Sequence, residues 1–83
     1  MIKVTRFEYS SAGNILLNFS DGSQGTFNLT AYLSEHHGSL LSPLHDPLYA
    51  KRVFIDAGAL CWPNGLEISP TRLHEYTQAK KAA

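Results

Sequence analysis

The fold of this chain is decided by the stretch Leu60-Cys61-Trp62-Pro63-Asn64-Gly65-Leu66-Glu67-Ile68-Ser69-Pro70. Pro63 and Asn64 suit the two central positions of a type I turn, and Gly65 then takes a positive φ at no steric cost, which closes a hairpin with a glycine bulge. A two-residue Asn64-Gly65 loop is the alternative, but it places Pro63 where a ladder N–H is wanted. Ser69-Pro70 is typical of a helix start. The stretch predicts strand, turn, strand and helix.

The lone tryptophan of the chain, Trp62, belongs to this stretch. Because its turn brings the ring to the junction of strand and helix, we expect Trp62 to be buried against Leu60, Ile68 and Leu73. The rival hypothesis is an exposed binding anchor, since aromatic residues often dominate interfaces. The stretch specifies shape, and it contains no group that points to a reaction.

Three segments before residue 30 predict an antiparallel meander; they are 2–9, 15–19 and 23–29. The first alternates imperfectly, which a bulge near Thr5-Arg6 would reconcile. Gly13 is the expected positive-φ residue of the first turn, and Asp21-Gly22 is a strong hairpin signal. Gly25 leaves a thin spot in the third segment. The N-terminal part therefore predicts a three-stranded sheet.

The middle of the chain changes from strand pattern to short helical turns. Thr30 can cap a short helix that ends near Gly38. Ser42-Pro43 and Asp46-Pro47 each pair a capping side chain with a proline. We therefore expect two tight or helical turns between residues 42 and 50.

The last third predicts a second hairpin and a C-terminal helix. Residues 51–56 and 60–62 read as strands joined by a turn at Ala57-Gly58, and the helix starts at Pro70 with Ile68 and Leu73 forming a hydrophobic staple. The expected fold class is α+β: an antiparallel sheet (three-stranded meander plus a second hairpin) with short helices and the C-terminal helix packed on the sheet. Residues 1–78 form one domain, and 79–83 are a frayed tail.

Composition excludes several classes of protein. The chain has 83 residues, enough for one domain, and seven basic residues balance seven acidic ones, so the surplus typical of nucleic-acid binders is absent. A single cysteine excludes an internal disulfide and a multi-cysteine zinc site, and it favours a reducing, cytoplasmic setting. No apolar run has the length of a signal peptide or a membrane span. We expect a soluble, cytoplasmic protein.

The chemically reactive side chains form no recognisable motif. The four histidines, which are His36, His37, His45 and His74, have no metal-ligand spacing and are interpreted as exposed loop residues. Asp46 beside His45 is better explained as a helix cap than as half of a dyad. Cys61 has no base beside it and is interpreted as a small hydrophobe, while Glu67 is expected to face solvent. We predict no catalytic, cofactor-binding or metal-binding residue, and no enzyme.

Basic residues near the end of the chain offer one electrostatic hypothesis. Lys51, Arg52 and Arg72, with Lys80-Lys81, would form a stripe if the last helix lay near the fourth strand. A solvated face explains them better, because the net charge is zero.

The order F-S-D-G (19–22), D-P (46–47) and W-P-N-G (62–65) resembles the small bacterial domain-of-unknown-function family 2442. The likeness runs from Val4 to about Leu73, with departures at Ala31 and Glu67. It implies a compact α+β domain without established catalytic residues. Its structural signature consists of Asp21, Gly22, Asp46, Pro47, Trp62, Pro63, Asn64 and Gly65.

The resemblance also implies a regulatory or partner-binding role, including an antitoxin-like one, because members are often encoded beside small toxin-like proteins. The sequence supports an interaction module, since Leu16 and Phe54 lie opposite Leu17 and Val53 and leave apolar residues on both sides of the sheet. A protein partner or self-association would cover them. The alternatives are a small-molecule or anion site near Trp62 and the prolines, and direct nucleic-acid binding, which the neutral charge disfavours.

Overall fold

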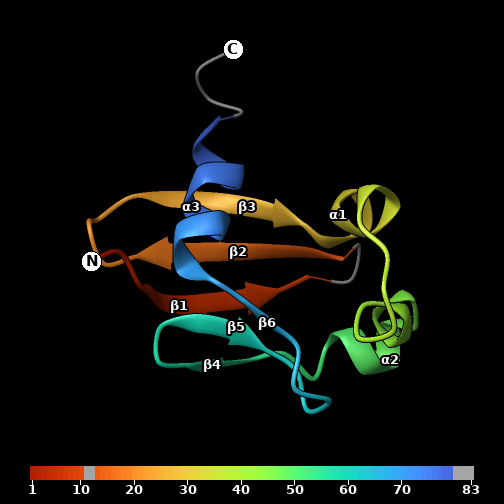
Figure 1. Ribbon diagram of the computed structural model, residues 1–83. Coiled ribbons are helices and arrows are strands. Elements are labelled where there is room, and N and C mark those ends of the chain that lie inside the picture. The colour runs from red at the N-terminus through yellow and green to blue at the C-terminus, as the bar shows by residue number, and fades with distance from the viewer. Residues whose placement is uncertain (11–12, 80–83) are drawn as a thin grey trace.

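The computed structural model describes residues 1–10 and 13–79, and it confirms the α+β fold class (Figure 1). Two three-stranded antiparallel sheets have the strand orders β1-β2-β3 and β4-β5-β6. The strands are β1 (Val4–Tyr9), β2 (Asn14–Phe19), β3 (Gln24–Asn28), β4 (Phe54–Asp56), β5 (Ala59–Cys61) and β6 (Glu67–Ile68). The helices are α1 (Leu29–Glu35), the 3-10 helix η1 (Ser42–His45), α2 (Pro47–Ala50) and α3 (Pro70–Ala79). Among the described residues no helix is long and apolar enough to cross a membrane.

The first sheet contains the predicted bulge in β1. Val4 pairs with Phe19 and Arg6 with Asn18, so the register shifts between Val4 and Arg6. An extra residue at this point reverses the alternation, and both Val4 and Phe7 can therefore face the core. The bulge therefore explains why the apolar residues of β1 do not alternate regularly along the sequence.

Both hairpins that carry family-signature residues close with the same turn. Gly65 has a φ of 94°, its N–H donates to the Trp62 carbonyl oxygen at 3.1 Å, and Trp62 N–H donates to Leu66 at 3.0 Å. Gly22, with a φ of 89°, donates to Phe19 in the same way at 3.0 Å. These are three-residue loops with a glycine bulge, so the prediction for Pro63-Asn64-Gly65 is confirmed over the two-residue alternative.

Two predicted helix caps are wrong. Helix α1 is capped by Asn28, whose side-chain oxygen accepts from Ala31 N–H at 3.0 Å, and Thr30 lies inside its first turn. The strand ends earlier than predicted because asparagine competes well for the cap position. The helix also ends at Glu35, before Gly38. Ser42 makes no capping hydrogen bond, and η1 begins after Leu41.

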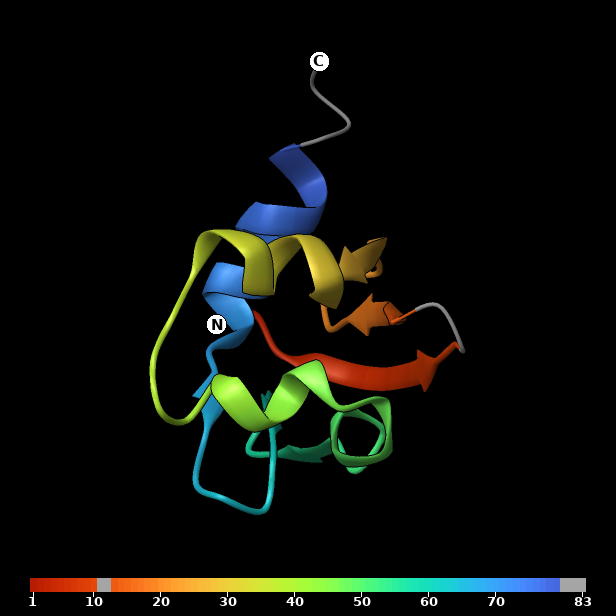
Figure 2. The same ribbon diagram turned by 90° about the vertical axis from the view of Figure 1, so that its right-hand side faces the viewer.

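Helix α3 packs across the face of the first sheet, close to β3 (Figures 1 and 2). Its start is as predicted, because Ser69 Oγ accepts from Arg72 N–H at 3.1 Å. Gly25 has no side chain, and this allows α3 to approach the sheet closely. A Cβ at this position would lie 2.6 Å from Thr77 Cβ. The helix reaches Ala79, the first residue of the predicted frayed tail, and the remaining tail residues 80–83 lie outside the described residues.

The core lies between α3, the first sheet and the short helices. Its largest fully buried side chains are Trp62, Phe27, Ile15, Leu17, Leu29, Leu60 and Leu73. Trp62 is 1% exposed and belongs to one core cluster with Leu60, Ile68 and Leu73. The predicted burial of this ring is confirmed, and an exposed anchor is excluded.

The turn between β4 and β5 joins the two sheets. Val4 N–H donates to the Gly58 carbonyl oxygen at 2.8 Å. Ala57 has a φ of 53° and Gly58 one of 82°, so both central residues lie in the left-handed region, as in a type I′ turn. Ala57 is the one non-glycine residue with a positive φ in the described part of the chain, and an alanine there is strained.

Replacing this alanine with a residue suited to the turn should stabilise the protein. We expect Ala57→Asn to raise the free energy of unfolding by about 0.5–1 kcal/mol, because asparagine tolerates a positive φ. The measurement is urea denaturation followed by Trp62 fluorescence. Ala57→Val is the control and should be less stable than the parent, since a branched Cβ worsens the strain. An asparagine variant no more stable than the parent would contradict this account of the turn.

Candidate functional site

The eight signature residues lie in three turns. Asp21-Gly22 forms the β2–β3 hairpin loop, Asp46-Pro47 begins α2, and residues 62–65 form the β5–β6 loop with its preceding residue. In each turn, side chains of the signature make hydrogen bonds within the fold.

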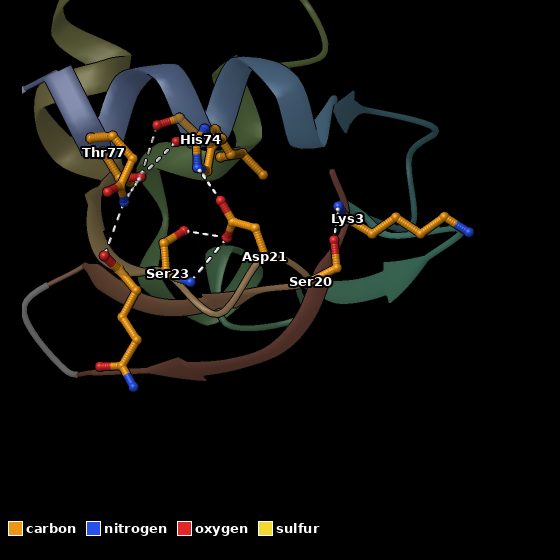
Figure 3. Close-up of polar contacts among 9 residues, drawn as sticks. Lys3, Ser20, Asp21, Ser23, His74 and Thr77 are labelled. Carbon is orange, nitrogen blue, oxygen red and sulfur yellow. Dashed lines mark hydrogen bonds and ion pairs between the residues drawn. The ribbon is translucent and has the colours of Figure 1, made fainter. Parts of the chain in front are cut away.

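Asp21 connects its hairpin to the last helix. One carboxylate oxygen accepts from Ser23 N–H at 2.9 Å and from Ser23 Oγ at 2.6 Å, and the other lies 3.1 Å from His74 Nε2 (Figure 3). The Ser23 hydroxyl and N–H, followed by His74, lower the pKa of Asp21. The His74 ring also meets Phe19 edge-on, with the ring centres 4.9 Å apart. The carboxylate is thus committed to holding α3 on the sheet.

The histidines are not all exposed loop residues, as the sequence suggested. His74 lies half-buried on α3, and His36 is half-buried at the end of α1 with its ring stacked on Tyr32 at 4.1 Å. His37 and His45 are exposed. Within residues 1–10 and 13–79, no three histidine, cysteine or acidic side chains are arranged to hold a metal ion.

Asp46 caps α2, as predicted. Its carboxylate accepts from Leu48 N–H at 3.0 Å, and Pro47 occupies the first helical turn. The carboxylate that would orient His45 in a dyad is therefore engaged by the helix backbone.

The W-P-N-G turn is tied to two distant segments. Trp62 Nε1 donates to the carbonyl oxygen of Ala50 at 2.9 Å, which fixes the turn to the end of α2. Asn64 Nδ2 donates to the Leu40 carbonyl oxygen at 3.0 Å, and its Oδ1 accepts from Leu66 N–H at 3.1 Å. Neither of the hydrogen bonds to Ala50 and Leu40 was predicted from the sequence. Their acceptors are backbone carbonyl oxygens, which every residue carries whatever its type. These signature side chains build the fold.

Cys61 is a buried strand residue, as predicted. Desolvation raises the pKa of its thiol, and the carboxylates of Glu67 and Asp56 raise it further. The thiolate is the nucleophilic form, so these surroundings suppress its reactivity. Glu67 is exposed, also as predicted.

The basic side chains are distributed over separate parts of the described structure. Lys51 and Arg52 follow α2, whereas Arg72 lies on α3, which packs near β3 over the first sheet (Figure 1). The Arg52 guanidinium lies 5.6 Å from the centre of the Tyr49 ring. Lys80 and Lys81 lie outside the described residues. The helix does not pack against the fourth strand as the stripe hypothesis required.

A pocket of about 370 Å³ lies between β1, α1, η1 and α2. Pro47 lines it, but Trp62 does not, so the hollow lies apart from the ring around which the sequence placed a ligand site. Its polar groups include Tyr9, Thr30 and His45. Nothing in the sequence pattern predicted that these residues would meet.

Neutralising Asp21 tests its role in joining the hairpin to α3. Because folding lowers the pKa of this group below its ordinary 3.8, its stabilising effect is present above that value and is lost as the pH falls through the lower folded value. We expect Asp21→Asn to be less stable than the parent at pH 7 in urea denaturation, with the difference shrinking as the pH is lowered from 4 to 2. Glu8→Gln, on the exposed outer face, is the control. A difference that persists unchanged at pH 2 would contradict an electrostatic role.

Comparison with known proteins supports the likeness seen in the sequence. The family profile described as "Protein of unknown function (DUF2442)" matches residues 4–79. No curated protein and no solved structure matches the chain.

Proposed function

The chain belongs to the DUF2442 family, and we propose that it works as a non-enzymatic protein-interaction module. The observation that carries the proposal is the exposure of large apolar side chains around α2 and the second sheet. Leu48 is 67% exposed and Phe54 is 43% exposed.

Phe54 stands on the outer face of the second sheet. It pairs with Cys61, which pairs with Glu67, whereas the neighbouring row of Ile55, Leu60 and Ile68 belongs to or packs on the core. Since successive strand residues point to opposite faces, the Phe54 row lies on the face opposite that core row, where Phe54 and Glu67 are exposed and Cys61 is buried. An aromatic ring on such a face supports contact with another protein.

Further apolar side chains are exposed in the segment that precedes β4, with Leu48 on α2 the most exposed of them. Leu40 is exposed ahead of η1, Tyr49 is half-buried on α2, and the Arg52 guanidinium lies near the Tyr49 ring. Tyrosine and arginine are enriched at interfaces, where they combine apolar contact with hydrogen bonding. We define the interaction surface by Leu40, Leu48 and Phe54.

The outer face of the first sheet offers a contrast. Leu16 is exposed there to a similar degree, 42%, but its cross-strand neighbours are Glu8 and Thr26. A single leucine among polar side chains is ordinary for a protein surface. Leu16 therefore serves as the matched control for Phe54.

Two arguments support a role without catalysis. The carboxylates of Asp21 and Asp46 are engaged by structural hydrogen bonds, and the Cys61 thiol is buried with a raised pKa. A general base or nucleophile needs the opposite surroundings, an accessible group with a pKa tuned to its task.

The partner that we propose is a protein with a complementary apolar surface, which includes a second copy of this chain. A regulatory, antitoxin-like role follows from family analogy alone. We also propose a cytoplasmic setting, supported by the single unpaired cysteine. Direct nucleic-acid binding is disfavoured by the zero net charge.

Surface variants test the module. The wild-type chain should either sediment with a concentration-dependent mass or retain a protein from extracts of its native host. We expect the double variant Leu48→Ser/Phe54→Ser to lose this association by at least about tenfold, as hot-spot residues do. Leu16→Ser should retain it.

The outcomes separate clearly. Equal loss in the double variant and in Leu16→Ser would contradict the surface assigned here. A wild-type protein that stays monomeric at every concentration and retains no partner would contradict the proposed function itself. Thermal unfolding of each variant checks that the fold is intact.

A further inference from the structure

The pocket between α1 and α2 has an apolar interior. Buried leucines from two elements line it, namely Leu29 and Leu33 of α1 and Leu44 of η1, together with Ala50 of α2. Its volume of about 370 Å³ lies at the small end of the range for ligand pockets. An occupant of one ring or a short chain would fit.

The walls of the pocket are held in place by hydrogen bonds outside it. Asn28 caps α1, Asp46 caps α2, and the Ala50 carbonyl oxygen accepts from Trp62. Leu29 N–H donates to the Gly13 carbonyl oxygen at 3.0 Å, which fixes Gly13 against the start of α1. The hollow is therefore preformed, which reduces the ordering cost of binding.

The polar groups of the pocket are suited to a hydrogen-bond acceptor. Tyr9 and Thr30 contribute hydroxyl groups, and His45 contributes an imidazole. Ser34 also lines the pocket, but its hydroxyl donates to the Ala31 carbonyl oxygen at 2.7 Å. His45 also borders a second hollow, of about 100 Å³, together with His36 and His37. Among the described lining residues of both hollows there is no aspartate or glutamate. The pocket thus offers hydrogen-bond donors, and the carboxylate of Asp46, which follows His45 in the chain, is not among its lining groups and accepts from Leu48 N–H.

We propose that this pocket binds a small amphipathic monocarboxylic acid. The apolar body of the ligand lies among the leucines between α1 and α2, and its carboxylate accepts hydrogen bonds at the His45 end. The site is distinct from the interaction surface formed by Leu40, Leu48 and Phe54, since none of those residues lines it.

The probe for this site is 4-phenylbutyrate, with the uncharged 4-phenylbutanamide as its matched analogue. Titration of the ¹⁵N-labelled chain should give saturable shifts at the amides of Leu33, Leu44 and Ala50, with a Kd below about 1 mM for a ligand of this size. The amide analogue should bind at least about fivefold more weakly, because it lacks the charge that strengthens the hydrogen bonds.

Two pairs of variants locate the occupant. Ser34 lines the pocket and Glu35, next in the same helix, does not, and both are exposed. Ser34→Phe should weaken binding of the acid at least about tenfold, whereas Glu35→Phe should leave it unchanged. His45→Asn should weaken binding of the acid more than binding of the amide, because the charged carboxylate makes the stronger hydrogen bond to this side chain, while His37→Asn changes neither by more than about twofold.

Several results would overturn the proposal. Absence of saturable shifts up to 10-fold above the expected Kd would exclude the site. Equal affinity for the acid and the amide would exclude carboxylate recognition, and equal effects of Ser34→Phe and Glu35→Phe would exclude the location. The spectrum of each free variant checks its fold, and Thr30→Leu, at an exposed residue that lines the pocket, gives a second blocking variant should Ser34→Phe fail to fold. Retained binding by Leu48→Ser/Phe54→Ser separates this site from the proposed interaction surface.

Discussion

The hydrogen bond from the Trp62 indole N–H to the Ala50 carbonyl oxygen is the constraint on which the rest of the structure depends. The ring is almost completely buried, and an indole N–H without a partner there would cost about 1–3 kcal/mol. Ala50 ends α2, and the last carbonyl groups of a helix lack intrahelical partners. The tryptophan and the helix end therefore satisfy each other. This bond fixes the β5–β6 turn against the end of α2.

Other residues of the predicted signature make hydrogen bonds of the same structural kind. Asn64 extends the tie to Leu40, Asp46 caps the helix that presents Ala50, and Asp21 fastens the opposite hairpin to α3. A domain of 83 residues has a small core, so it needs side chains that join its turns. The residues that identify the family maintain the shape, and function is to be sought on surfaces that the signature leaves free.

Residues that act through local backbone geometry were well predicted from the sequence. Gly65 and Gly13 take positive φ where turn chemistry requires it, the bulge in β1 lies where the alternation fails, and Ser69 caps α3. Thr30 was predicted to cap α1, and this was wrong because the side chain of Asn28, two residues earlier, caps the helix instead. The sequence offered no way to foresee that Tyr9, Thr30 and His45 meet around one pocket, since their meeting depends on how separate elements pack. The hydrogen-bond acceptors of Trp62 and Asn64 could not be predicted for a related reason. Both are backbone carbonyl oxygens, which every residue carries.

The central claim is that Trp62 supports the core and is not a binding residue. Urea denaturation of Trp62→Ala, followed by far-ultraviolet circular dichroism, tests it most directly. Removing a buried aromatic side chain costs about 3–5 kcal/mol, a large part of the stability of a domain this small, so the variant should unfold at much lower urea concentration or be unfolded in buffer. Trp62→Phe should fall between the two proteins, since it keeps a ring but leaves the Ala50 carbonyl oxygen without the indole donor. A Trp62→Ala protein that unfolds at the same urea concentration as the parent would contradict the account.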